Sequence, residues 1–166
     1  MARQLWLLRH AEAEPHGTRV DSERRLTARG EAQARAAGVA LKRLDVVFEA
    51  VLFSPKVRAR QTAELAAEAW STAQRERLAE HGPLAGEFRA AHAQDALHAV
   101  SADGRLLLVG HEPDLSGLLH ELTGGRVDFK KGGVAAVRLE RASGELVILL
   151  RPRELALIAG VPAGRE

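Results

Sequence analysis

Cysteine is absent from this chain of 166 residues, and several other features of specialised proteins are missing as well. Without a thiol there can be no disulfide, no cysteine nucleophile and no cysteine-bound zinc or iron–sulfur site. No apolar run reaches the roughly 20 residues that a membrane-spanning helix needs. The net charge is only +2, and acids and bases are mixed, unlike the basic stripe typical of a nucleic-acid-binding protein. We therefore expect neither a membrane nor a nucleic acid as partner.

The length and composition are those of one globular domain with a single core. Hydrophobic residues make up 46% and charged residues 28% of the chain, which is ordinary for a soluble protein. We expect the domain to span residues 1–160 and residues 161–166 to form a frayed tail, because Pro162 and Gly164 interrupt regular structure there. The opening residues lead into the first expected strand without the longer apolar core of a signal peptide. A cytoplasmic location is therefore expected.

Short apolar runs of strand length alternate with helical patterns along most of the chain. The expected strands are 4–9, 50–54, 75–78, 106–109, 134–139 and 146–150, the last two joined as a hairpin by a turn at 142–145. The expected helices begin near Thr27 and Ser54, span 87–100 and 113–122, and end with a short one at 153–158. This alternation predicts a single-domain α/β fold, a layered α/β/α sandwich. Its sheet should be mainly parallel, with an antiparallel part near the C-terminus.

Polar side chains stand at the carboxyl ends of three expected strands. The first strand ends in Arg9 and His10, the second leads to Arg58 in the next helical turn, and the fourth ends in Gly110 and His111. The carboxyl ends of parallel strands meet at one edge of a sheet, so these side chains should line one crevice. Arginine holds phosphate oxygens bidentately, and helix N-termini attract anions. Each residue alone fits an ordinary surface role, but the three strand ends together predict a phosphate site.

Four stretches, in order, carry a resemblance to a known family. They are Leu8-Arg9-His10, Leu26-Thr27 with Gly30 and Gln33-Ala34, Ser54-Pro55 with Arg58-Ala59 and Gln61-Thr62-Ala63, and Gly110-His111. Together they resemble the histidine phosphatase superfamily, which is also called phosphoglycerate mutase-like, and they cover nearly the whole chain. One departure is Ala11, where the family commonly has glycine. Because alanine is small, we expect the change to be tolerated unless the position needs a positive φ.

Within that superfamily the chain looks most like the SixA-type phosphohistidine phosphatases. It is short, it lacks the long insertion before the second histidine that forms a cap in mutase-type members, and it carries Asp21, Arg24 and Leu26-Thr27 in the pattern of the SixA group. The resemblance implies that His10 is the nucleophile that accepts the phosphoryl group. It implies that Arg9, Arg58 and His111 hold the phosphoryl oxygens, with Arg24 as an additional phosphate or substrate contact.

Two residues are candidates for the general acid of the reaction. Mutase-like members place a glutamate after the third strand, and Glu80 is the positional match here. A solvated loop glutamate is the competing interpretation for this residue, and Glu12 is a second candidate. A phosphohistidine substrate would lessen the need for an acid, because its P–N bond breaks more readily than the P–O bond of an alcohol ester.

The residues also predict how the reaction proceeds. His10 would attack phosphorus in line, and water would hydrolyse the resulting phosphohistidine. Positioning and positive charge supply most of the catalysis in phosphoryl transfer, and the arginines provide that charge, so no metal and no other cofactor is expected. Nearby positive charge should also keep His10 neutral. The remaining histidines and Lys130-Lys131 are interpreted as surface residues without a metal-binding role.

Three functions are compatible with this pattern. The first is a phosphatase that acts on phosphohistidine in a protein partner, such as a phosphotransfer domain, for which a site without a cap would be open enough. The second is a phosphatase for small phosphate esters, such as sugar phosphates or nucleotides. The third is a non-catalytic phosphate-binding module, which the presence of all four core residues disfavours.

Overall fold

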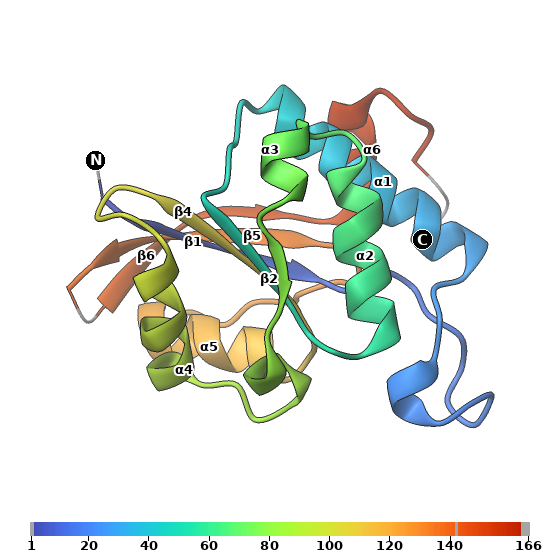
Figure 1. Cartoon of the computed structure of the whole chain (residues 1–166), viewed down its shortest axis with the longest axis horizontal. Coiled ribbons are helices and arrows are strands. Elements are labelled where there is room, and N and C mark those ends of the chain that lie inside the picture. Colours follow the sequence, from blue (N-terminus) through green and yellow to red (C-terminus); the bar gives the residue numbers. More distant parts are fainter. Residues whose placement is uncertain (1, 142, 164–166) are drawn as a thin grey trace.

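One six-stranded sheet forms the centre of the computed structural model, which describes residues 2–141 and 143–163 (Figure 1). The strands are β1 (Gln4–Arg9), β2 (Ala50–Phe53), β3 (Leu78–Glu80), β4 (Arg105–Gly110), β5 (Val134–Glu140) and β6 (Ser143–Leu150). Their order is β3-β2-β4-β1-β5-β6. The first four strands in that order pair in parallel, whereas β5 pairs antiparallel with both β1 and β6. The predicted fold class, mainly parallel with an antiparallel part near the C-terminus, is confirmed.

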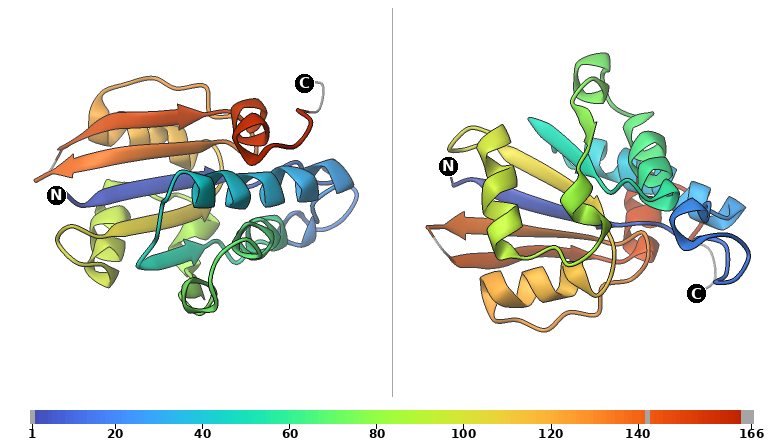
Figure 2. Two further views of the ribbon diagram at one scale, coloured as in Figure 1. Left: turned by 90° about the horizontal axis from the view of Figure 1, so that it is seen from above. Right: turned by 60° about the horizontal axis from the view of Figure 1, so that its bottom comes forward.

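Helices cover both faces of this sheet (Figure 2). One face carries α1 (Ala28–Arg43), α2 (Val57–Ala67) and α6 (Pro152–Ala159), and the other carries α4 (Ala90–Ala96) and α5 (Asp114–Thr123). The short α3 (Thr72–Arg75) follows α2. Three 3-10 turns, at Asp21–Glu23, Gly82–Ala85 and Leu97–Ala99, complete the described helices. Within the described ranges, none of the helices combines the length and the apolar content that crossing a bilayer requires.

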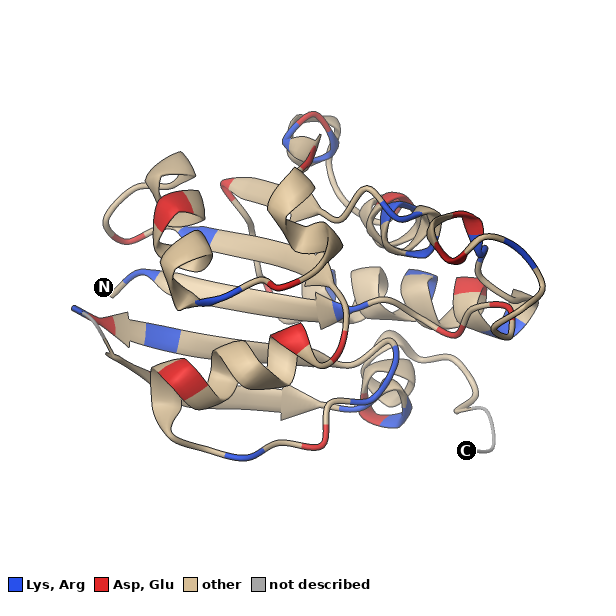
Figure 3. Ribbon diagram, turned by 90° about the horizontal axis from the view of Figure 1, so that it is seen from below, with Lys and Arg blue, Asp and Glu red and all other residues tan. Residues whose placement is uncertain are grey.

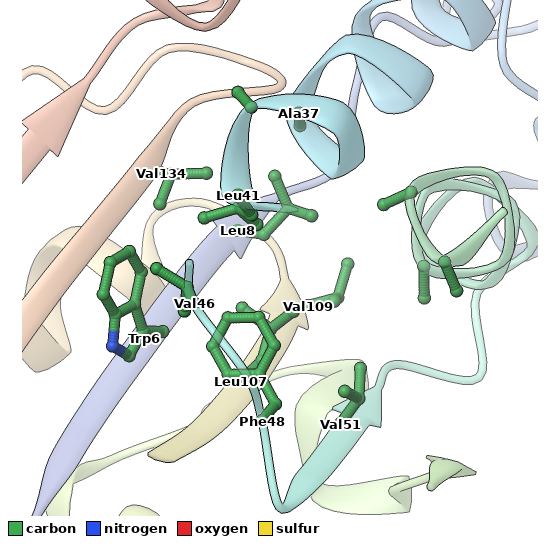
Figure 4. Packing of buried hydrophobic residues seen from close by; sticks show 14 of the residues in the cluster. Trp6, Leu8, Ala37, Leu41, Val46, Phe48, Val51, Leu107, Val109 and Val134 are labelled. Atoms are coloured by element: carbon green, nitrogen blue, oxygen red, sulfur yellow. The ribbon is translucent and has the colours of Figure 1, made fainter. Parts of the chain in front are cut away.

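The alternation of side chains along β1 explains why the sheet is covered on both faces. Trp6 and Leu8 pack into the cluster beneath α1, α2 and α6, which Figure 4 shows, whereas Leu5 and Leu7 pack on the opposite side. Successive residues of a strand point to opposite faces, so an uninterrupted apolar run needs two apolar layers. The carboxyl ends of β1, β2 and β4 consequently emerge together between the layers.

The helices α1 and α2 approach each other closely because Gly38 has no side chain. A Cβ atom added at Gly38 would lie 1.9 Å from the carbonyl oxygen of Ala66 in α2. The indole nitrogen of Trp70 donates a hydrogen bond of 3.0 Å to the Gly38 carbonyl. Trp6 and Trp70 are both buried in the core.

Four expected boundaries were wrong. The second helix begins at Val57 rather than near Ser54, because Lys56 is extended and forms its N-cap. The third strand begins at Leu78 rather than Arg75, because the Ser71 hydroxyl accepts a hydrogen bond from the Gln74 N–H and caps a helical turn over residues 72–75. The expected helix at 87–100 begins at residue 90 as α4, after Glu87, which has φ = 58°, and its last turn is a 3-10 helix. The strand β6 begins at 143 instead of 146, so most of the expected 142–145 turn is strand; residue 142 lies outside the described residues.

The domain boundary at residue 160 stays a prediction. The structure describes residues 161–163, of which Val161 donates from its N–H to the Ala156 carbonyl at 3.0 Å. Residues 164–166 of the expected tail lie outside the described residues.

Candidate active site

The parallel register brings the two histidines of the sequence motif together. Arg9 pairs with Gly110 across β1 and β4, and the N–H of His10 donates to the Gly110 carbonyl at 3.0 Å. The residues that follow the two strands are therefore neighbours, and the ring centroids of His10 and His111 are 5.2 Å apart. On the other side of β4, the N–H of Ser54 donates to the Val109 carbonyl at 3.0 Å, which places the start of α2 at the same edge.

His10 is held as a neutral imidazole with one defined free nitrogen. Its ring is buried, and Nδ1 lies 2.8 Å from the Ala11 carbonyl oxygen. A carbonyl oxygen can only accept, so Nδ1 carries the proton and the lone pair is left on Nε2. Burial, followed by the charges of Arg58 and Arg9, lowers the pKa of His10 to about 3, although its hydrogen bond to the Ala11 carbonyl acts in the opposite direction. At neutral pH Nε2 is therefore available as a nucleophile.

His111 presents the opposite face of the same crevice. Its Nε2 lies 2.7 Å from the Ser54 hydroxyl, and that hydroxyl already accepts a hydrogen bond of 3.3 Å from the Lys56 N–H. Its Nδ1 is buried and has no hydrogen-bond partner among the described residues. Burial first, and then the proximity of His10 and Arg58, lower the pKa of His111 to about 3. This imidazole is also neutral at pH 7.

Two guanidinium groups supply the positive charge at this edge, that of the buried Arg58 and that of the half-buried Arg9. Arg58, in the first turn of α2, is 4% exposed and donates from Nη1 to the Asp21 carbonyl at 2.7 Å. Arg9 donates from Nη1 to the Phe129 carbonyl at 2.6 Å. The Nε atoms of both arginines are buried without a hydrogen-bond partner among the described residues. Buried donors left unpaired are costly, and an anion with several oxygen atoms would satisfy them.

The Asp21 carboxylate forms ion pairs with three cationic side chains of the site. Its carboxylate accepts two hydrogen bonds from Arg24, at 3.1 and 2.9 Å, and lies 3.3 Å from both the Arg58 and the Lys56 nitrogens. Burial acts to raise the pKa of Asp21, but the hydrogen bonds from Arg24 and the charge of Arg58 outweigh it and hold the pKa well below its usual range. Arg24, the predicted additional contact, is thus linked to Arg58 through this carboxylate, and its Nη1 also donates to the Glu14 carbonyl at 2.7 Å.

Residues of α1 and α2 that belong to the family-like stretches hold the chain that follows β1. A Cβ atom at Gly30 would lie 1.9 Å from the Glu12 carbonyl oxygen, and the Gln33 amide oxygen accepts the Glu12 N–H at 3.0 Å. The Thr62 hydroxyl accepts the N–H of Ala11 at 3.1 Å. Ala11 is fully buried and is not among the residues with positive φ. An alanine therefore fits where the resembled family commonly has glycine, as expected.

The two candidate acids, Glu80 and Glu12, have no described contact with His10. Glu80 ends β3 and is half-exposed, and its carboxylate accepts a hydrogen bond of 2.6 Å from Arg60 of α2. Glu12 has a buried carboxylate oxygen 3.8 Å from the Arg29 guanidinium. No described contact joins either carboxylate to His10. The general acid therefore stays a prediction.

Three contacts of this site were not assigned from the sequence. Ser54 was expected only to start a helix, Asp21 only to belong to a family pattern, and Lys131 only to lie on a surface loop. The charge of Lys131 contributes to the low pKa of His10, because the next N–H along the chain, that of Gly132, donates to the carbonyl oxygens of Arg9 and His10. The adjacent glycine pair at 132–133 was the available signal, since glycines permit such close backbone contact. Across the described residues, no cluster of three or more histidine, aspartate or glutamate side chains is arranged to hold a metal ion.

Comparison with known proteins defines the class to which this site belongs. The sequence pattern of the histidine phosphatase superfamily (branch 1) matches residues 5–103. An uncharacterised protein of Picosynechococcus sp. is 31% identical in an alignment 172 positions long, and the alignment covers 92% of this chain and 98% of that protein. The structure of the protein histidine phosphatase SixA in complex with tungstate is similar, with a TM-score of 0.76 and 25% identity. That match covers 92% of this chain and 99% of SixA.

A second solved structure agrees. A protein from Nakamurella multipartitia, assigned as a phosphohistidine phosphatase SixA, has a TM-score of 0.75 and 26% identity, over 92% of this chain and 97% of its own. An Escherichia coli K-12 protein assigned as an α-ribazole-5′-phosphate phosphatase shares the fold alone, at a TM-score of 0.66 and 23% identity. That match covers 92% of this chain and 98% of the other. This chain belongs to the histidine phosphatase superfamily, and it is a phosphatase.

Proposed function

We propose that this phosphatase dephosphorylates phosphohistidine in a signalling protein, such as a phosphotransfer domain, through a covalent intermediate on His10. The observation that carries the mechanism is the hydrogen bond from His10 Nδ1 to the Ala11 carbonyl, which leaves Nε2 with a lone pair in a cationic, buried crevice. The similarity to SixA over nearly the whole chain supports the substrate class.

In the first step, His10 Nε2 forms a bond to phosphorus while the bond from phosphorus to the substrate nitrogen breaks. The leaving nitrogen keeps the electron pair of that bond and takes a proton from solvent water. In the second step, a water oxygen forms a bond to phosphorus while the bond from phosphorus to His10 Nε2 breaks. The water gives up a proton to solvent, and inorganic phosphate and neutral His10 are released. Arg9 Nε, Arg58 Nε and His111 Nδ1 are the buried atoms without hydrogen-bond partners in the described structure that would bind the phosphoryl oxygens. Fixed hydrogen-bond donors of this kind, two of them on positively charged guanidinium groups, stabilise the transition state, so we propose a reaction without a metal ion.

Ser54 orients the second histidine in this proposal. Its hydroxyl accepts the Lys56 N–H, so its own proton can be donated to His111 Nε2. The proton of the neutral His111 then lies on Nδ1, directed to phosphate. Glu80 would have to leave its ion pair with Arg60 to act as an acid. A phosphohistidine substrate makes that step unnecessary, because imidazole is a good leaving group.

The test is a comparison of kcat/KM for a histidine-phosphorylated phosphotransfer domain and for a panel of sugar phosphates and nucleotides, with EDTA present. A clear preference for the phosphoprotein supports the proposal, and a preference for an ester assigns the chain to small-molecule phosphatases. A parallel experiment traps the labelled enzyme by rapid denaturation. We expect an acid-labile label on the native protein, and neither label nor turnover with His10→Ala. A His10→Ala variant with substantial activity would refute the nucleophile assignment, and an inactive native protein that binds phosphate would indicate a binding module.

The cytoplasmic location expected from the sequence is part of the same proposal, because phosphotransfer signalling would place the enzyme with its partner. Fractionation of cells that express the tagged protein checks it. Recovery in a membrane or extracellular fraction would contradict this part.

A further inference from the structure

A groove of about 780 Å³ runs between α1 and α6, next to the phosphate site. Arg9 lines one end, and Val39 and Val161 lie farther along it. His10, Arg58 and His111 do not line it, so the groove is distinct from the histidine pair, although it shares Arg9, Glu12 and Lys131 with the site described above. In both views of Figure 2, α6 lies alongside α1 on the same face of the sheet.

The floor of this groove is apolar. Ala32, Ala36 and Val39 of α1 contribute a stripe at helical spacing, and Ala156 of α6 faces it. Residues three and four apart lie on one side of a helix, so the stripe is continuous over about 10 Å of α1. A groove between two helices with small apolar residues at its base is a surface that accepts an amphipathic helix. A small phosphate ester bound at His10 would reach only the end of the groove that Arg9 lines.

The rim of the groove is basic. Six of its lining residues are lysines or arginines and one, Glu12, is acidic. Some of these cations already face carboxylates: Arg35 lies 3.0 Å from Glu68, and Lys130 lies 2.9 Å from Asp128. Lys131 and Arg153 form no ion pair within the part of the chain that the structure describes. The charge of the rim therefore favours an acidic occupant.

The backbone connects the rim directly to the nucleophile. Gly132 donates its N–H to the carbonyl oxygens of Arg9 and His10, and a Cβ atom at Gly132 would lie 3.6 Å from Pro152 at the start of α6. Lys131 therefore stands between the phosphate site and α6. Figure 3 shows the basic positions of the loop that leads into β5 next to those at the start of α6. A ligand in the groove would be continuous with a phosphoryl group at His10.

We propose that this groove binds an acidic amphipathic helix of the phosphoprotein substrate. Its apolar stripe would pack on Ala32, Ala36 and Ala156, and its carboxylates would pair with Lys131 and Arg153. The inference rests on the proposed function and adds to it the element that would distinguish a phosphoprotein from a small phosphate.

The experiment uses two substrates with the same scissile bond. One is a phosphotransfer domain phosphorylated on histidine with phosphoramidate, and the other is the free amino acid N-phosphohistidine. The variant is Ala32→Glu combined with Arg153→Glu, which adds like charge and bulk to the groove at positions away from His10. We expect a roughly tenfold or greater rise in KM for the phosphoprotein, typical of reversing charge at an interface, with kcat/KM for free phosphohistidine within about twofold of native. Added salt should raise KM for the phosphoprotein in the native enzyme more than in the variant.

A matched control reverses a charge elsewhere. Arg75 is exposed at the end of α3, which follows the C-terminus of α2 and so lies away from the edge where α2 begins. Arg75→Glu should leave KM for the phosphoprotein unchanged. An equal effect of Arg75→Glu would show that overall charge, rather than the groove, decides binding, and would overturn the proposal.

The other outcomes separate the two proposals. If the native enzyme prefers the phosphoprotein and the groove variant keeps its KM, the groove is refuted and the proposed function stands. If the native enzyme hydrolyses free phosphohistidine as efficiently as the phosphoprotein, or hydrolyses only esters, the proposed partner and its docking helix are both refuted. If the variant raises KM equally for both substrates, the groove binds small anions, and the helix is the wrong occupant.

Discussion

Two neutral imidazoles at the candidate active site should make this protein lose stability as the pH falls from 7 to 5. The pKa of His10 and that of His111 are each lowered from 6.5 to about 3, chiefly by burial. In the unfolded chain both would return to 6.5 and bind protons in this range, whereas the folded protein does not. A group whose pKa is lower in the folded state than in the unfolded state favours unfolding wherever only the unfolded state is protonated. Stability should therefore fall with decreasing pH.

The magnitude follows from the proton uptake on unfolding. Between pH 7 and pH 5, a histidine that titrates at 6.5 only when unfolded costs about 2 kcal/mol of folding free energy, so the pair costs about 4 kcal/mol. The result does not depend closely on the folded values, because a pKa of 4 would still leave each imidazole neutral at pH 5. His81, whose pKa burial also lowers, acts in the same direction. The carboxylates of Glu14 and Asp21 also have a lowered pKa, but their ordinary values are 4.5 and 3.8. Their contribution to the stability of the fold is therefore lost mainly below pH 5.

The measurement is urea denaturation at half-unit steps between pH 7 and pH 5. The native protein should lose about 4 kcal/mol of unfolding free energy, which is a large part of the 5–15 kcal/mol typical of a domain. His10→Gln and His111→Gln each remove one titrating group, so each variant should lose about 2 kcal/mol less over the same range. A stability that stays constant from pH 7 to pH 5, or variants with the native slope, would show that these imidazoles are not buried in the neutral form.

Two further predictions concern single residues. Arg58→Ala should lower kcat/KM by about 100- to 1,000-fold, or roughly 3–4 kcal/mol, by analogy with the loss of one transition-state hydrogen-bond donor; a steady-state assay that finds less than a threefold change would remove Arg58 from the site. Gly38→Ala should destabilise the protein by about 1–3 kcal/mol or more in urea denaturation, since its Cβ would overlap the Ala66 carbonyl. Gly117→Ala in α5 is the matched control, because nothing lies within 4 Å of its Cβ. That change should be neutral or stabilise by up to about 1 kcal/mol, and equal losses in the two variants would contradict the packing argument.

Local sequence patterns were sufficient to predict an element where a single effect, such as the burial of an apolar run, decides its structure. The apolar runs that become β1 and β4 are long enough to specify buried strands, and a buried parallel strand has to end at a common edge. That reasoning predicted that Arg9, His10 and His111 would meet, and the structure places the two histidine rings 5.2 Å apart. The boundaries that were wrong lie where competing local hydrogen bonds decide, as at Ser71.

The parts of the site that were missed depend on contacts between segments far apart in the chain. Asp21 contacts Arg58, which lies 37 residues later, and nothing in the local sequence of either predicts that pairing. Lys131 lies beside His10 only because β5 pairs with β1 and brings the preceding loop to the same strand end.

The sequence by itself determined the class of fold and the order of the layers, and it indicated the residues that we propose to hold a phosphate. These follow from hydrophobic periodicity and from the geometry of parallel strands, which are local properties repeated along the chain. Only the tertiary structure decided which nitrogen of His10 is free, which carboxylate orients the arginines, and that a basic groove lies between α1 and α6. Those features arise when distant segments pack together, because burial and proximity, rather than residue type alone, set protonation and charge.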